Sequence, residues 1–152
     1  MIYFLDTSAL AKRYLTEPGS SGIRRLLERE DNVFYQAFVT PLEVSSAFYR
    51  QLRSRRISSE ELSLLLRAYI AHSYQDYLLV PYSDSLIDRA LALVARHVLR
   101  ALDALQLASA LDLRDSLPAQ APLLGFLSAD ARLLDAAREE HLQAENPEHW
   151  KS

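Results

Sequence analysis

The sequence contains no cysteine, only three glycines, and no apolar run near the roughly 20 residues that a membrane span requires. Without cysteine, disulfides, thiolate zinc sites and cysteine nucleophiles are excluded. The four histidines have no spacing typical of metal ligands, and we interpret them as surface or structural residues. Metal chemistry in this chain would therefore depend on oxygen ligands.

Positive charge does not predominate either. The formal net charge is -3 and the isoelectric point is near 5.8, so the molecule as a whole does not attract nucleic acid. A polyanion would have to be drawn by a local basic patch or by bound cations. Residues 49–56 hold such a patch, Tyr-Arg-Gln-Leu-Arg-Ser-Arg-Arg, but these arginines can equally complement the dipole at the end of a helix.

Several catalytic signatures are missing as well. The sequence contains no G-x-x-x-x-G-K-[ST], no G-x-G-x-x-G and no G-x-S-x-G, which excludes nucleotide-loop, dinucleotide-binding and serine-hydrolase functions of those types. The segment around Asp6 also lacks the second aspartate, two residues on, that phosphatases of the haloacid dehalogenase type use.

The 152 residues, 49% of them hydrophobic, predict a single domain over 1–152. The apolar run 2–5 is too short for a signal peptide and lacks a basic leader, so we expect a cytoplasmic protein with no membrane segment. The strands are expected at 2–5, 33–39, 78–80, 122–127 and 142–144. The helices are expected at 9–15, 21–30, 41–53, 59–74, 83–98, 101–111 and 131–140. This alternation predicts an α/β protein, a three-layer α/β/α sandwich with a mainly parallel central sheet.

Four carboxylates, Asp6, Glu43, Asp103 and Asp130, each stand at the start of an expected helix, and three of them follow a strand. Each alone is explained as a helix cap, and Glu43 also completes a capping box with Thr40. Together they are expected at the carboxyl edge of a parallel sheet, where such folds bind ligands. Clustered carboxylates repel by about 1 kcal/mol per pair in water. An all-oxygen cluster therefore favours Mg²⁺ or Mn²⁺ as counter-charge.

Four segments resemble the acidic motifs of PIN-domain ribonucleases, and more narrowly those of VapC toxins from type II toxin–antitoxin systems. They are YFLDTSAL at 3–10, TPLEV at 40–44, LRALDAL at 99–105 and LSADARL at 127–133. Order and spacing agree along nearly the whole chain, and Asn146-Pro147 is similar to the usual ending of the family.

The resemblance implies a PIN fold, Mg²⁺- or Mn²⁺-dependent endonucleolytic cleavage of RNA, a cognate VapB-type antitoxin and a homodimer. It implies that Asp6 and Asp103 are the principal metal ligands and that Glu43 and Asp130 complete the cluster. Other residues implied to orient these carboxylates are Thr7, Ser8 and Ser128. Gln106 departs from the pattern, because many relatives have histidine there.

Two further questions stay open at the level of sequence. The candidate contacts for RNA phosphates are Lys12, Arg13, Arg53, Arg55 and Arg56, because an acidic protein must place its positive charge locally. The alternatives to a toxin are a PIN nuclease outside the toxin class and a catalytically idle PIN-like binding module. The presence of all four acids argues against the idle module.

Overall fold

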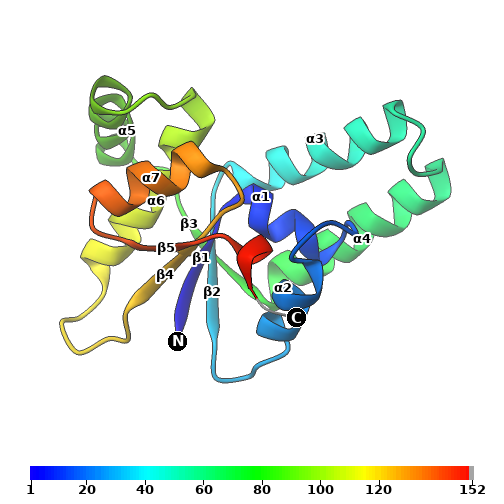
Figure 1. The fold of residues 1–152 in the computed structure, drawn as a ribbon, viewed down its shortest axis with the longest axis horizontal. Helices are drawn as coiled ribbons and strands as arrows, with labels where there is room; N and C mark the ends of the chain where they lie inside the picture. Colours follow the sequence, from blue (N-terminus) through cyan, green and yellow to red (C-terminus); the bar gives the residue numbers. More distant parts are fainter. Residues whose placement is uncertain (151–152) are drawn as a thin grey trace.

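The computed structural model, which describes residues 1–150, shows a parallel sheet between two layers of helices (Figure 1). The strands are β1 (Ile2–Leu5), β2 (Val33–Ala37), β3 (Tyr77–Val80), β4 (Leu124–Leu127) and β5 (Gln143–Glu145). The helices are α1 (Thr7–Leu10), α2 (Ser20–Leu27), α3 (Thr40–Arg53), α4 (Ser59–Gln75), α5 (Asp84–Arg96), α6 (Ala101–Ser116) and α7 (Ala131–Glu139), with 3-10 turns η1 (Ala11–Arg13) and η2 (Pro147–His149). The predicted α/β fold with a parallel central sheet is confirmed.

The strand order is β3-β2-β1-β4-β5, and all four pairings are parallel. Every strand therefore ends at the same edge of the sheet. The side chains of β1 alternate between the two faces, since Phe4 belongs to one hydrophobic core and Leu5 to the other. Phe4 stacks on Phe126 of β4 with ring centroids 5.7 Å apart. The central strands β1 and β4 thus anchor both layers.

One face of the sheet is covered by α5, α6 and α7, and the other by α1 to α4 (Figure 1). Helix α6 lies deepest. It buries eight residues, most of them leucine and alanine, as its nearly continuous apolar sequence predicts. Its first turn carries Asp103, which places a carboxylate at the start of a core helix. Within residues 1–150, no helix combines the length and hydropathy needed to span a bilayer.

Several predicted bounds differ from the structure: the strand expected at 33–39 ends at Ala37, and the helix expected at 101–111 continues to Ser116. Two further predictions differ in kind. The expected helix 9–15 is a short α1 followed by the 3-10 turn η1. The capping box at Thr40 is wrong: Val39 is the N-cap residue of α3, and no side chain caps that helix. The Thr40 hydroxyl instead accepts a hydrogen bond from Gln106 of α6. By contrast, the capping box of Ser58 and Glu61 at the start of α4 is confirmed.

Candidate functional site

The four predicted acids line one pocket at the carboxyl edge of the sheet, in a cavity of about 400 Å³. Asp6 directly follows β1, and Asp130 follows β4 as the N-cap of α7. Glu43 and Asp103 come from the first turns of α3 and α6. Parallel pairing sends β1 and β4 to the same edge, and the helices that start there supply the other two acids. The structure therefore brings all four acids together.

Asp6 is the most buried of these acids, with 5% of its surface exposed. Its Oδ2 accepts hydrogen bonds from the Ser8 amide at 3.2 Å, the Ser8 hydroxyl at 2.5 Å and the Ser128 hydroxyl at 2.9 Å. Burial raises the pKa of Asp6 and these hydrogen bonds oppose the rise. Within residues 1–150 every hydrogen bond to this carboxylate ends on Oδ2, so Oδ1 is available to a ligand.

Ser8 and Ser128 also connect the ends of β1 and β4. The Ser8 hydroxyl accepts a hydrogen bond from the Ala129 amide at 2.8 Å, and the Ser128 hydroxyl accepts one from the Asp130 amide at 3.0 Å. Asp130 then caps α7, because its Oδ1 accepts from the next helical amides. Two of the residues expected to orient the carboxylates thus contact Asp6 directly.

Glu43 is held from α6. Its Oε1 accepts a hydrogen bond of 2.7 Å from the Gln106 side-chain amide, which also lies 3.0 Å from the hydroxyls of Thr7 and Thr40. Burial raises the pKa of Glu43, and hydrogen bonds from Gln106 and Thr7 oppose this. Sequence reasoning did not place Gln106 in the site. The available signal was a glutamine one helical turn after Asp103 in an otherwise apolar helix.

Asp103 lies beside a second, smaller cavity of about 130 Å³ that Asp130, Arg100 and Arg132 also line. Burial raises the pKa of Asp103 and the Asp130 carboxylate adds to the rise, whereas Arg100 and Arg132 oppose it. Arg100 lines the main pocket too, together with Arg50. Arg50 belongs to the basic patch at 49–56 that the sequence singled out. Arg100 was missed, although it precedes Asp103 by only three positions, across the helix start.

The structure argues against the predicted contact of Lys12 with RNA. This residue lines the acid pocket, but only 2% of its side chain is exposed. Its Nζ lies 2.7 Å from Glu148 and 3.4 Å from Glu17, so both partners are already carboxylates of the protein. Lys12 therefore holds η2 and the segment after η1 together through two ion pairs at the side of the pocket.

Arg13 also has partners within the protein, but its side chain is 21% exposed and its contact with RNA stays a prediction. Its guanidinium donates to Asp76 at 2.7 Å and to the Tyr77 hydroxyl at 2.6 Å, on the side of β3. Arg53, Arg55 and Arg56 are exposed near the turn between α3 and α4 and do not line the acid pocket. Contact of these three with RNA stays a prediction.

The donor set fits a hard divalent cation in kind, because the pocket offers carboxylate and hydroxyl oxygens without nitrogen or sulfur ligands. Burial raises the pKa values of Asp6, Glu43 and Asp103, and among residues 1–150 no arginine, lysine or histidine forms an ion pair with these three carboxylates. Within residues 1–150, however, no three acidic or histidine side chains stand close enough to hold one ion as they are placed. Closing a coordination shell would therefore require side-chain movements toward the ion.

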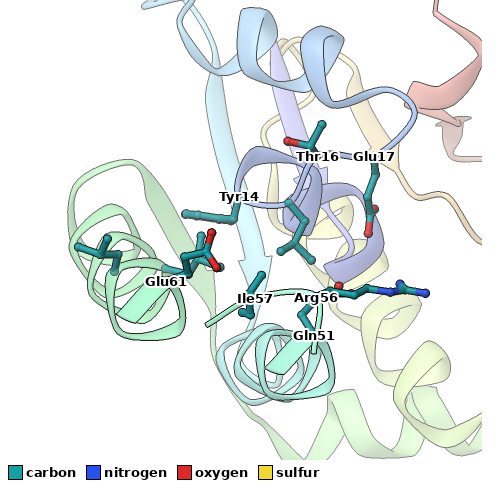
Figure 2. Close-up of a pocket in the computed structure, with 10 residues that line it drawn as sticks. Tyr14, Thr16, Glu17, Gln51, Arg56, Ile57 and Glu61 are labelled. Atoms are coloured by element: carbon teal, nitrogen blue, oxygen red, sulfur yellow. The ribbon is translucent and has the colours of Figure 1, made fainter. Parts of the chain in front are cut away.

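Another concave region, away from the acids, lies between η1, the α3–α4 turn and α4 (Figure 2). Its volume is about 520 Å³. The lining residues are Tyr14, Leu15, Thr16, Glu17, Gln51, Arg56, Ile57, Glu61, Leu64 and Leu65. We call this region the helical groove. Leucine and isoleucine side chains lie beside the charged Glu61 and Arg56, which is a composition suited to an amphipathic partner.

The fold and the pocket define a class of protein: a three-layer α/β/α domain with four carboxylates at the carboxyl edge of a parallel sheet. A family model for the PIN domain matches residues 3–139, and the chain belongs to the PIN domain family. No curated protein sequence matches the chain.

Solved structures with the same fold include toxin–antitoxin complexes. VapBC2 from Rickettsia felis, bound to a DNA fragment from its promoter, has a TM-score of 0.64 and 14% identity over 96% of this chain and 98% of that chain. FitAcB from Neisseria gonorrhoeae has a TM-score of 0.63 and 16% identity over 99% and 100%. VapC20 from Mycobacterium tuberculosis, a toxin that cleaves the sarcin-ricin loop, has a TM-score of 0.61 and 17% identity over 88% and 94%. At these identities the likeness establishes the fold.

Proposed function

We propose that this protein is a metal-dependent endoribonuclease of the VapC toxin type, using Mg²⁺ or Mn²⁺ in the cytoplasm, with all 152 residues in a single PIN domain. The observation that carries the proposal is the pocket in which Asp6, Glu43, Asp103 and Asp130 meet. Unpaired carboxylates with raised pKa values are costly to gather unless they bind a cation or take part in proton transfer. The toxin–antitoxin neighbours support the narrower class.

In this mechanism Asp6 and Asp103 would hold the cation, and Glu43 and Asp130 would complete its ligand set directly or through water. When bound, the cation lowers the pKa of water and offsets charge on the phosphate. Ser8 and Ser128 fix Oδ2 of Asp6 and leave Oδ1 for the ion. The carboxylates also provide local bases for the proton of the attacking water.

Positive charge beside the acids completes the site for a phosphodiester. Arg50 and Arg100 line the main pocket, and Arg132 shares the smaller cavity with Arg100. An arginine can donate two parallel hydrogen bonds to phosphate oxygens. These side chains can therefore hold phosphates next to the scissile one while the acids act at the reacting centre.

The direct test is cleavage of mixed RNA by the purified protein with Mn²⁺ or Mg²⁺, with and without EDTA. We expect cleavage only with the ion, and sequencing of the new 5′ ends would identify the target. Cleavage that persists in EDTA would contradict metal dependence. RNA binding without cleavage would favour the idle binding module instead.

The proposed antitoxin partner fits the helical groove. We expect an amphipathic helix that inserts apolar side chains beside Leu64, of which 61% is exposed. Leu64→Asp should weaken binding of the cognate antitoxin at least about tenfold, because it buries an unpaired charge in the interface. RNA cleavage, measured as a control, should stay unchanged because Leu64 does not line the acid pocket. Unaltered antitoxin affinity would move the partner to another surface.

A homodimer remains part of the proposal. Apolar side chains on and just after α5, namely Leu91, Val94 and Val98, are exposed by 66%, 46% and 86%. Analytical ultracentrifugation of the purified chain would measure the oligomeric state. A monomer at all accessible concentrations would contradict the dimer.

A further inference from the structure

Gln106 lies on helix α6 beside the acid pocket. It is fully buried, polar and uncharged, and its side chain connects α6 to two other helices. Its exposed fraction is 0%, and its Nε2 lies 2.7 Å from Oε1 of Glu43. The same nitrogen lies 3.0 Å from the hydroxyls of Thr7 on α1 and Thr40 on α3. The amide is therefore a cross-link between the helix starts that carry the acids.

The orientation of this amide follows from Glu43. The two Thr hydroxyls could each donate to an amide oxygen, so they would accept either orientation of the group. The Glu43 carboxylate has no proton to donate to an amide oxygen. If the Gln106 amide were flipped, its oxygen would lie 2.7 Å from a carboxylate oxygen with no hydrogen bond between them. In the observed orientation the amide oxygen, Oε1, is buried without a hydrogen-bond partner. The observed orientation therefore keeps the hydrogen bond to Glu43 and leaves the amide oxygen without one.

We propose that Gln106 is a positioning residue, whose side-chain amide holds the Glu43 carboxylate in the acid pocket so that Glu43 is pre-organised as a ligand for the divalent cation. This inference rests on the proposed metal site. A residue kept only for core packing needs no donor here, and an apolar side chain of similar volume would leave no buried oxygen unsatisfied. The donor is explained by the acid that it contacts.

The test is Mn²⁺ affinity, measured by isothermal titration calorimetry on the whole chain. Gln106→Met keeps the volume and removes the donor, and we expect about tenfold weaker binding, within the range for loss of a partner that orients a metal ligand. Gln106→His returns an N–H donor to the position and should recover part of the affinity. Affinity equal to wild type in Gln106→Met would overturn the inference.

The chain offers a matched control in Gln36. This glutamine on β2 is 1% exposed and accepts a hydrogen bond of 2.7 Å from the Tyr69 hydroxyl, outside the acid pocket. Gln36→Met removes a buried amide as Gln106→Met does, so the two should have comparable effects on melting temperature without metal. Only Gln106→Met should weaken Mn²⁺ binding. Equal weakening by both variants would assign the effect to a general loss of order and overturn the inference.

A double-mutant cycle separates a role through Glu43 from a direct role. In the Glu43→Gln background, adding Gln106→Met should cost no further Mn²⁺ affinity, because the carboxylate that it positions is already gone. A further tenfold loss would show that Gln106 acts independently of Glu43 and would overturn the proposal. If wild type binds no Mn²⁺, the metal site itself fails; if wild type binds and Gln106→Met binds equally, only this inference fails.

Discussion

The acid pocket and the contact between α5 and α6 both gather carboxylates, but they neutralise them differently. Between these helices, Arg89 pairs with Asp112 at 3.0 Å and with Asp115 at 2.8 Å, and Arg114 pairs with Asp115 at 2.9 Å. Burial raises the pKa of Asp115, but hydrogen bonds from the two arginines outweigh it and hold the pKa below its ordinary value. We call this set the arginine-paired cluster.

In the acid pocket the balance is reversed. Glu17 and Glu148, which also line the pocket, pair with Lys12. Within residues 1–150, however, none of the four candidate ligands Asp6, Glu43, Asp103 and Asp130 forms an ion pair. Burial is the largest cause of the raised pKa values of Asp6, Glu43 and Asp103. The same residue type therefore stabilises the fold in one region and is held ready for a ligand in the other. The two regions differ in whether an arginine side chain already pairs with the carboxylates. Because the four pocket acids have no such partner, we interpret the pocket as the functional site.

The largest expected effect comes from removing one charge in each region. Asp6→Asn should lower RNA cleavage by more than about a hundredfold, because loss of even an outer partner of a metal ligand costs about 10–100-fold. Its melting temperature without metal should stay equal or rise, since a buried charge is removed. Cleavage rates and thermal melts in EDTA measure the two effects.

The matched control for that change is Asp115→Asn. It should leave cleavage unchanged and cost about 1 kcal/mol or less, because exposed ion pairs contribute little. Asp103→Asn should behave as Asp6→Asn does. Full activity in either pocket variant would contradict the metal-nuclease proposal and erase the functional difference between the two regions.

The next effect concerns arginines that are free to bind phosphate and arginines that are already paired. Arg100→Ala should lower the slope of log K against log salt for single-stranded RNA by about 0.7, the value for one phosphate contact. Arg89→Ala should leave the slope unchanged, because its guanidinium is held by Asp112 and Asp115. Filter binding or fluorescence anisotropy over a range of salt concentrations measures both.

The same titration tests the arginines that sequence alone singled out. Replacing Arg53, Arg55 and Arg56 together should lower the slope further if RNA reaches the turn between α3 and α4. An unchanged slope would assign these side chains to the helix end and, for Arg56, to the helical groove. A slope that falls equally for Arg89→Ala would show that ion pairing does not decide which arginines bind RNA.

The fold was predictable because its signals are local. Apolar runs that end at polar residues marked β1, β2 and β4, a short apolar run before Pro81 marked β3, and the capping box of Ser58 and Glu61 marked α4. The alternation of strands and helices predicts a parallel sheet, in which all strands end at the same edge. The acids that follow those strands could therefore be predicted to meet there. The start of α3 was predicted in the right place for the wrong reason, since Thr40 and Glu43 bond to Gln106 and not to the helix end.

The details of the site were not predictable because they depend on contacts across long sequence separations. Lys12 looks like a surface cation in sequence, and only the fold brings Glu148 to it. Gln106 looks like a departure from a motif, and only packing against α3 shows what its amide contacts. Partners that are 136 and 63 positions apart in sequence leave no local pattern.

The smallest expected effect is the pH dependence of stability without metal, where the two regions have opposite signs. Raised pKa values in the folded state mean that Asp6, Glu43 and Asp103 bind protons more readily when folded than when unfolded. Their contribution is fully present below the ordinary carboxyl pKa of about 4 and is lost as the pH rises through the raised values. Asp115, whose pKa is lowered, contributes above that range and loses its contribution only as the pH falls below it.

Melting temperatures in EDTA should therefore rise as the pH is lowered from neutral toward the ordinary carboxyl pKa of about 4, because the pocket acids take up protons. Each kcal/mol corresponds to about 2–4 °C for a chain of this size. Asp6→Asn should flatten the rise, whereas Asp115→Asn should leave it unchanged over the same range. With saturating Mn²⁺ the pocket contribution should change sign, because protons compete with the ion for the carboxylates. A rise that survives in Asp6→Asn at full size would mean that other groups carry the titration and that this pocket acid is not short of counter-charge.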